Sequence, residues 1–347
     1  MTAKKSFLIA LAITCLAFPV SLVLVLNPFE RSADFALSDF YTRAAMRKAE
    51  PTISKEVVIV GVDGLSRKET ADVVAYVDYF KPKVVALDVF MEYPSESDSS
   101  VVSVLNECST LMLPEDLNNP EHGPVYSNVK PAYWGYANLE ATQHGAVVRR
   151  FCIEKDGKQA LAAIAAGRGM TSDSIGNGGL IVFQGHEFDV IGPEELVKLG
   201  SSLEGKIVLV GNLSDISDRH PTPIGEMAGV LIHANIIQTI IDGSVPKEAG
   251  RTWCMILAFC ISLLLMWAHV RVSHISGEIA NLALRISQLV MLYLIYLAGS
   301  LLFIKYGLYV DFALTILLVA AASVAFDVFY GVAAIFRRRA AARSGKK

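Results

Sequence analysis

The segment Glu56-Val-Val-Ile-Val-Gly-Val-Asp63 decides the fold class of this chain. It is a near-continuous run of apolar residues rich in valine, and such a run is typical of a strand that is buried on both faces of a parallel sheet. Similar runs occupy residues 83–90 and 205–211, and helical spacing of apolar residues at 70–80 separates the first two runs. The alternation of strand and helix predicts an α/β fold.

The residues around these strands predict the rest of a mixed, mainly parallel sheet with right-handed crossovers. A helix at 99–107 and a strand at 109–113 continue the alternation, and residues 113–133 and 212–227 have the polar, proline-containing composition of loops. The remaining expected elements are helices at 31–48, 160–169, 194–199 and 230–241, and hairpins that join 135–139 to 146–153 and 180–183 to 187–190.

Four apolar segments are long enough, or nearly so, to cross about 30 Å of hydrocarbon as helices. They are residues 7–26, 253–270, 286–304 and 312–333. The chain is 53% hydrophobic and only 19% charged, whereas soluble domains carry about a quarter charged residues. The first segment is long and lacks a small-residue cleavage site, so it is expected to remain as an anchor. The sequence therefore predicts four transmembrane helices, one N-terminal and three C-terminal.

The basic residues predict the orientation of these helices. Ten lysines and arginines lie before the first segment, between the second and third, or after the fourth, and only Lys305 lies between the third and fourth. Cytoplasmic loops carry the excess of lysine and arginine, so both termini are expected in the cytoplasm. The predicted order is cytoplasmic residues 1–6, a span at 7–26, an extracytoplasmic domain at 27–252, three spans at 253–336 and a basic cytoplasmic tail at 337–347.

The distribution of charge restricts the partners. Residues 27–252 carry 31 acidic and 20 basic side chains, and the remainder carries 3 acidic and 11 basic ones. An acidic domain gains no free energy from counterion release on a polyphosphate, which excludes nucleic acid as a partner. The basic tail suits anionic membrane lipid. The chain contains no nucleophile elbow, phosphate-binding glycine loop or HExxH motif, so we predict no catalytic residue and no cofactor.

Three polar residues come at or just after the ends of predicted strands: Asp63, Asp88 and Asn212. Because ligands of open α/β sheets bind at the carboxyl ends of the strands, these residues are candidates for binding a ligand or a divalent cation. Alternatively, Asp63 and Asp88 cap the turns or helices that follow them.

A second group of candidates lies near the end of the predicted extracytoplasmic domain. Asp218 and His220 are candidate ligand-binding residues, and together with His233 they have side chains that bind metal ions. Their spacing is not a zinc signature, so we predict no metal; the alternative is a structural loop with a buried, hydrogen-bonded His233. Arg149 is a candidate for pairing with a ligand carboxylate or phosphate, or with an aspartate at a strand end.

Two further predictions concern cysteine and a charged residue in a span. Cys108 and Cys152 are the only cysteines in the predicted extracytoplasmic domain, where thiols can be oxidised, so a disulfide between them is expected if their strands are neighbours. Asp327 lies within the fourth apolar segment. An ionisable residue there usually faces protein, which predicts a contact with another span or a partner; alternatively, Asp327 is a protonated acid near the inner interface.

Several of these stretches together resemble the CHASE domain of type 2, the cyclase/histidine-kinase-associated sensory extracellular domain. The resemblance covers about residues 30–245 and extends to the arrangement of one span before the domain and three after it. The stretches that carry it are Val57-Val-Ile-Val-Gly-Val-Asp63, Val84-Val-Ala-Leu-Asp-Val-Phe90, Gly145-Ala-Val-Val-Arg-Arg150, and a block that runs from Gly205-Lys-Ile-Val-Leu-Val-Gly211 through Ser217-Asp-Arg-His-Pro-Thr-Pro223 to Ala228-Gly-Val-Leu-Ile-His-Ala-Asn235.

The resemblance implies a receptor of the bacterial inner membrane that senses an unidentified signal outside the cytoplasm. In this family a kinase or nucleotide cyclase usually follows the last span, whereas only residues 337–347 follow it here. We therefore expect a non-enzymatic sensor that passes its output to a separate effector, a kinase or nucleotide cyclase, with a homodimer as a further possible assembly. The alternatives are a scaffold subunit of a bacterial envelope complex and an extracytoplasmic metal-dependent enzyme that uses Asp63 and Asp88.

Overall fold

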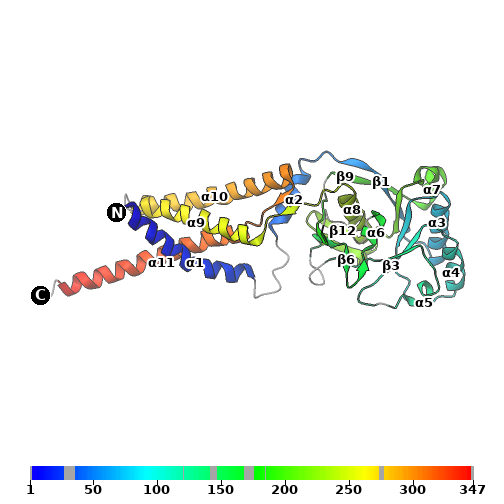
Figure 1. Cartoon of the computed structure of the whole chain (residues 1–347), viewed down its shortest axis with the longest axis horizontal. Coiled ribbons are helices and arrows are strands. Elements are labelled where there is room, and N and C mark those ends of the chain that lie inside the picture. Colours follow the sequence, from blue (N-terminus) through cyan, green and yellow to red (C-terminus); the bar gives the residue numbers. More distant parts are fainter. Residues whose placement is uncertain are drawn as a thin grey trace. The chain divides into compact units, whose positions relative to one another are not determined.

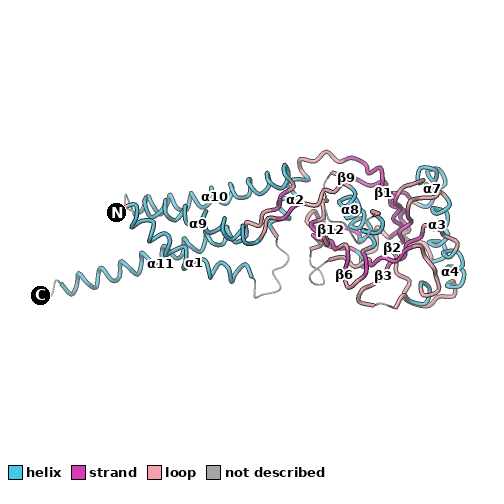
Figure 2. Tube along the Cα trace, viewed as in Figure 1, coloured by secondary structure: helices cyan, strands magenta, loops and turns pink. Residues whose placement is uncertain are grey.

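The computed structural model describes residues 2–26, 36–119, 121–140, 147–167, 176–183, 185–272 and 277–344. The chain divides into two compact units. The α/β unit is Thr42–Pro246, and the helical unit combines Met1–Tyr41 with Lys247–Lys347. Figure 1 marks the elements of both units, and Figure 2 separates helices, strands and loops by colour.

The α/β unit is built on a six-stranded sheet in which every neighbouring pair is parallel. Its strand order is β4-β3-β2-β10-β1-β9. The strands are β1 (Thr52–Gly61), β2 (Val84–Asp88), β3 (Leu111–Glu115), β4 (Tyr133–Tyr136), β9 (His186–Ile191) and β10 (Ile207–Gly211). The predicted fold class, mixed α/β with a mainly parallel sheet, is confirmed.

The central strand β10 shows why the apolar runs form this sheet. It pairs with β1 on one side and with β2 on the other, so that Val208 lies between Val58 and Val85. All five residues of β10 are buried. Successive side chains of a strand point to opposite faces, and both faces of β10 are packed, with Val208 in one hydrophobic cluster and Leu209 in another. A strand of this kind needs apolar residues at every position.

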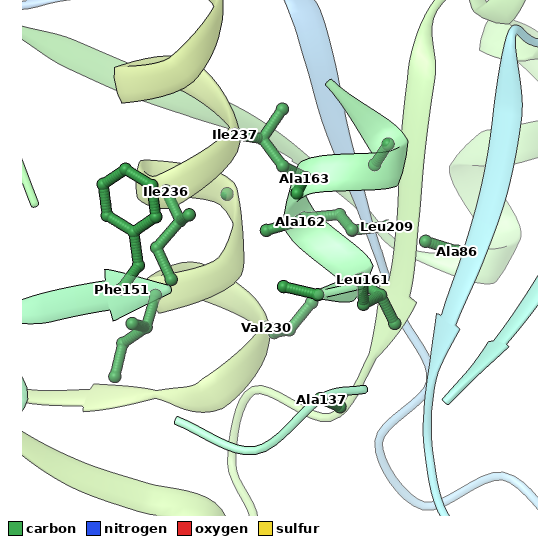
Figure 3. Packing of buried hydrophobic residues seen from close by; sticks show 14 of the residues in the cluster. Ala86, Ala137, Phe151, Leu161, Ala162, Ala163, Leu209, Val230, Ile236 and Ile237 are labelled. Carbon is green, nitrogen blue, oxygen red and sulfur yellow. The ribbon is translucent and has the colours of Figure 1, made fainter. Parts of the chain in front are cut away.

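Helices cover both faces of the sheet (Figure 1). On one face lie α3 (Arg67–Tyr79), α4 (Asp98–Asn106) and α7 (Pro193–Leu199), and on the other lie α6 (Leu161–Ala165) and α8 (Gly229–Ile241). Figure 3 shows the second layer, in which Leu209 of β10, Leu161 of α6 and Ile237 of α8 belong to one hydrophobic cluster. Coverage on both faces removes the apolar strands from water.

Both predicted hairpins are wrong, because their strands pair elsewhere. β4 pairs in parallel with β3, and β9 pairs in parallel with β1, so both are edge strands of the main sheet. The strands that were expected to pair with them instead pair with each other: β5 (Arg150–Cys152) is antiparallel to β8 (Gly178–Leu180). A single antiparallel bridge joins Glu140 to Arg150. The expected turn at His144-Gly145 lies outside the described residues.

The two predicted loops contain short regular elements. Residues 113–133 include the helix α5 (Gly123–Tyr126), and residues 212–227 include most of the antiparallel pair β11 (Arg219–Thr222) and β12 (Gly225–Ala228). A local hydrogen bond stabilises the turn between β11 and β12: the hydroxyl of Thr222 donates to the carbonyl oxygen of Gly225 at 2.6 Å. The other short elements are α2 (Leu37–Met46), β6 (Glu154–Lys155), β7 (Lys158–Gln159), 3₁₀ turns at Gly200–Leu203 and Ile216–Asp218, and the pair β13 (Lys247–Glu248) and β14 (Leu308–Tyr309).

The helical unit contains four helices that are long and apolar enough to cross a membrane. They are α1 (Ala3–Leu26), α9 (Arg251–Val272), α10 (Gly277–Tyr306) and α11 (Ala313–Ser344). α1, α9 and α11 pack against one another, and Ile13, Ala258 and Leu318 are buried between them. One candidate span near the N-terminus and three near the C-terminus agree with the prediction from the sequence.

Candidate functional site

A cleft of about 970 Å³ opens at the carboxyl ends of the parallel strands in the α/β unit. The neighbouring strands β2 and β10 are followed by helices on opposite faces of the sheet, α4 and α8 respectively. The chain leaves the two strands in opposite directions, and ligands of open α/β sheets bind in the crevice that such a divergence creates. Asp88 at the end of β2 and Asn212 just after β10 both line the cleft.

Four of the six candidate ligand-binding residues line this cleft. They are Asp88, Asn212, Asp218 and His220, and His233 of α8 joins them. Asp88 lies more than 120 residues before Asn212 and Asp218 in the sequence, and the parallel pairing of β2 with β10 brings the two segments to one edge. Asp63 and Arg149 are not among the residues that line the cleft.

The structure gives Asp63 and Arg149 contacts with backbone groups. The carboxylate of Asp63 accepts hydrogen bonds from the backbone N–H groups of Leu213 at 3.0 Å and Ser214 at 2.8 Å. Burial raises the pKa of the Asp63 carboxyl, but the hydrogen bonds from Ser214 and Leu213 outweigh burial and keep this pKa below its ordinary value. The guanidinium of Arg149 donates to the carbonyl oxygen of Val147 at 3.4 Å. Asp63 therefore holds the segment that follows β10, whereas the capping alternative expected it to cap the turn or helix directly after β1; the cap of α3 is Ser66.

Asp88 lies next to Gly211 of β10 at the floor of the cleft. It is surrounded by protein, yet part of its surface stays accessible through the cleft. Burial raises the pKa of the Asp88 carboxyl, the nearby His233 and His220 lower it, and Asp218 raises it. Within the described part of the chain, no group donates a hydrogen bond to this carboxylate.

Asp218 occupies the amino end of α8. Its Oδ2 accepts a hydrogen bond from the backbone N–H of Gly229 at 3.2 Å, and its Oδ1 lies 3.3 Å from Nε2 of His220. A carboxylate at this position interacts favourably with the partial positive charge of the helix amino end. A Cβ atom at Gly229 would lie only 2.7 Å from Oδ1 of Asp218, so a larger residue there would displace this carboxylate.

His233 reaches the cleft from the first turns of α8 and is only 4% exposed. Its Nε2 lies 3.1 Å from the carbonyl oxygen of Ala137, which follows β4. Its Nδ1 is buried and has no hydrogen-bond partner among the described residues. The buried, hydrogen-bonded histidine that we considered as an alternative is thus present, but only one of its two nitrogens is satisfied.

The side chains of Asp218, His220 and His233 do not share one set of contacts. Among the residues that the structure describes, no three histidine, cysteine, aspartate or glutamate side chains come together as a metal-binding group. Asp218 and His220 contact each other, whereas His233 is bonded to a backbone carbonyl group. These three side chains therefore do not converge as three metal ligands in the described part of the chain.

Other polar residues that line the cleft were not predicted from the sequence. Asp116 follows β3 and Asn138 follows β4, and the amide Nδ2 of Asn138 donates to Oδ1 of Asp116 at 2.7 Å. Glu92 lies four residues beyond the end of β2 and also lines the cleft. The rule that selected Asp88 would have selected Asp116 and Asn138 as well, if the ends of β3 and β4 had been recognised as ends of parallel strands.

The predicted disulfide is not formed. Cys108 and Cys152 are both free thiols. Cys108 packs in the hydrophobic cluster beneath α3 and α4, and the Cys108 thiol donates to the carbonyl oxygen of Val104. Cys152 ends β5, next to the cluster on the opposite face of the sheet. The two strands are not neighbours, which was the condition for the bridge.

Asp327 contacts another candidate span of the helical unit. Its Oδ2 accepts a hydrogen bond from Arg285 of α10 at 2.8 Å, and the same guanidinium donates to the hydroxyl of Ser323 at 3.0 Å. The two charged side chains are 57% and 45% exposed, so the ion pair lies on the surface of the helix bundle and not at its centre. The expected contact with a second span is thus present within the chain.

The contacts of Asp218 lead to a first prediction. We expect Asp218→Ala to lower the free energy of unfolding by about 1 kcal/mol, because the substitution leaves the first N–H group of α8 without its acceptor. Asp218→Asn, which keeps a side-chain oxygen and removes the charge, should lose less. Denaturant unfolding of the purified full chain, followed by limited proteolysis of the α/β unit, measures both. Equal stability of wild type and Asp218→Ala would show that the 3.2 Å contact contributes nothing.

Comparison with known proteins identifies one relationship. A family model described as the CHASE2 domain matches residues 11–271. This range includes the whole α/β unit and therefore every residue that lines the cleft. No curated protein and no solved structure matches the chain significantly.

Proposed function

Because this chain belongs to the CHASE2 domain family, a family of sensory extracellular domains, we propose that it is a sensor of the bacterial inner membrane that binds its signal molecule in the cleft of the α/β unit. The α/β unit lies outside the cytoplasm in this proposal, and the four apolar helices span the membrane. The role is sensory and not catalytic. Output passes through the helical unit to an effector on the cytoplasmic side, a kinase or a nucleotide cyclase.

The observation that carries this proposal is the cleft between the diverging strands β2 and β10. Its volume of about 970 Å³ lies at the upper end of the range of about 300–1,000 Å³ that small-molecule sites occupy. It combines a half-buried carboxylate, Asp88, with polar side chains from other elements, including Asn212 and His220. A few polar groups that converge in a concave site are what fix the orientation of a small ligand.

A cleft-filling variant tests the binding site. We propose thermal unfolding of the detergent-solubilised full chain with and without a mixture of small metabolites, in the wild type and in Asn212→Trp. A ligand at about 100 times its Kd stabilises a protein by about 2.7 kcal/mol, so the wild type should unfold at a higher temperature with the mixture. Asn212→Trp occupies the cleft and should show no such shift. The same shift in both proteins would place any binding elsewhere and reject the cleft.

A second prediction concerns orientation. Reporter enzymes fused at Ser217 and after the last residue should behave oppositely, the first active only outside the cytoplasm and the second only inside it. The physical reason is the excess of lysine and arginine on the segments proposed to be cytoplasmic, against Lys305 alone at the opposite end, in the last turn of α10. A fusion within the 1–6 segment should match the C-terminal one. Identical behaviour of the fusions at Ser217 and at the C-terminus would contradict the proposed orientation.

A further inference from the structure

Nδ1 of His233, a residue that lines the cleft, is an unused hydrogen-bond acceptor. His233 Nε2 is bonded to the carbonyl oxygen of Ala137 at 3.1 Å. A carbonyl group can only accept, so Nε2 carries the hydrogen, and in the neutral ring Nδ1 then has a lone pair. This nitrogen is buried and lacks a donor among the described residues. A buried polar atom left unsatisfied is costly, which points to a donor supplied by a ligand.

The carboxyl group of Asp88 also lacks a hydrogen-bond donor among the described residues, although it is surrounded by protein. Buried charges are normally paired or hydrogen-bonded, because an isolated one is expensive. His233 and Asp88 both line the cleft and are close enough to interact electrostatically. A ligand that brings positive charge and N–H donors would satisfy both groups at once.

The cleft is poorly suited to an anion. In folds of this kind the amino end of a helix attracts anionic ligands, but the first N–H group of α8 is already bonded to the carboxylate of Asp218. The basic side chains at the rim have other partners. Arg67 pairs with Asp98 at 3.2 Å, Lys155 pairs with Glu140 at 3.0 Å, and Arg219 donates to the carbonyl oxygen of Leu213 at 3.3 Å.

We infer that the cleft binds a small organic cation with a protonated primary amine, in which the carboxylate of Asp88 is the counter-ion and His233 Nδ1 and Asn212 accept hydrogen bonds from the ammonium group. This inference rests on the proposed function and adds the chemical class of the signal molecule. A divalent metal ion is a poorer fit, because no three-ligand group exists among the described residues. A volume of about 970 Å³ suits an organic molecule.

The titratable side chains that surround Asp88 in the cleft determine how ligand binding depends on pH. The cation requires the ionised form of Asp88, and burial raises the pKa of that carboxyl. Affinity should therefore fall as the pH is lowered through this pKa. The other titratable groups that act on Asp88 are His233, His220 and Asp218. Protonation of either histidine, or of Asp218, makes the cleft more positive, so each change weakens cation binding in the same direction.

The experiment compares matched probes on the full chain in detergent, by thermal shift and isothermal titration calorimetry. The probes are 1,4-diaminobutane, its neutral isostere 1,4-butanediol, Mg²⁺ alone and inorganic phosphate. We expect the wild type to bind the diamine only, with an affinity that falls at least tenfold in Asp88→Asn and is unchanged in Asp189→Asn, an exposed aspartate of β9 outside the cleft. Binding of the diamine by wild type should also weaken at low pH.

The folding of Asp88→Asn is not expected to limit the test. Because the pKa of Asp88 is raised in the folded protein, its ionised form destabilises the native state as the pH rises through that pKa, and the amide removes this penalty. The melting temperature should stay the same or increase. Equal binding of diamine and butanediol, preference for Mg²⁺ or phosphate, or an affinity that neither Asp88→Asn nor low pH reduces would each overturn the inference. If the metabolite mixture still stabilises the wild type but not Asn212→Trp, the proposed sensory cleft stands and only its ligand class is wrong.

Discussion

Replacing Gly178 with alanine is expected to be among the most damaging single substitutions in the α/β unit. Gly178 begins β8 with φ +134°, a backbone conformation that residues with side chains rarely adopt, and a Cβ atom there would lie 2.0 Å from the carbonyl oxygen of Phe151. The added methyl group must push β5 away, and β5 carries Phe151 into the hydrophobic cluster shown in Figure 3. We expect Gly178→Ala to lower the free energy of unfolding by at least about 3 kcal/mol.

Gly225 provides a matched control for this prediction. Its φ is +133°, almost identical to that of Gly178, but no atom lies within 4 Å of the position of its Cβ. Gly225→Ala therefore introduces the same backbone strain without the collision, and should cost about 1–3 kcal/mol. Denaturant unfolding of the two purified variants measures the difference. If both lose the same stability, strain alone accounts for the loss and the close packing of β5 on β8 contributes nothing.

The ion pair between Arg285 and Asp327 should show an asymmetry that depends on the membrane. Asp327 lies nine residues before Phe336, the end of the apolar part of α11, which is about 13 Å along a helix. A short aspartate side chain cannot reach the headgroups from that depth, whereas an arginine can extend toward them. We expect Arg285→Ala, which leaves Asp327 without its cation, to destabilise the helical unit by about 2–3 kcal/mol, and Asp327→Ala by about 1 kcal/mol.

The double variant tests whether the two residues act together. Removal of both side chains should cost less than the two single losses combined, with a coupling of at least about 1 kcal/mol. Unfolding of the detergent-solubilised chain by titration with a denaturing detergent provides the measurement. Arg271→Ala serves as the control, because Arg271 is an exposed basic residue at the end of α9. Simple additivity would mean that the 2.8 Å contact in the structure is not an energetic pair.

The main strands could be predicted because the residues within each strand are enough to identify it as a buried strand. In β2, in β10 and in residues 57–61 of β1 nearly every side chain is buried, so these stretches must be apolar throughout, and this pattern is readable without knowledge of the neighbours. β4 and β9 were assigned to the wrong partners for the opposite reason. They are edge strands, and the glycine-containing turns beside them resemble hairpin turns. Only the sheet, which offers a free edge at β3 and at β1, determines where they pair.

Residues of the candidate site could be predicted where the sequence identifies the end of a strand. Asp88 and Asn212 follow strands that the sequence identifies, and the structure brings both to the cleft. Asp63 follows a strand of the same kind but is used to hold the turn at Leu213 and Ser214, and no local pattern separates these two uses of an aspartate. Asp116 was missed because the end of β3 was assigned to a loop.

The sequence by itself determined the class of the sheet, the four apolar helices and the family, since burial on both faces and the thickness of a membrane each require a long apolar pattern. The tertiary structure alone decided the strand order, the free thiols of Cys108 and Cys152, and the contact between Arg285 and Asp327. It also decided that His233 has one satisfied and one unsatisfied nitrogen. These features depend on which distant residues become neighbours, and packing sets that relation across the whole chain.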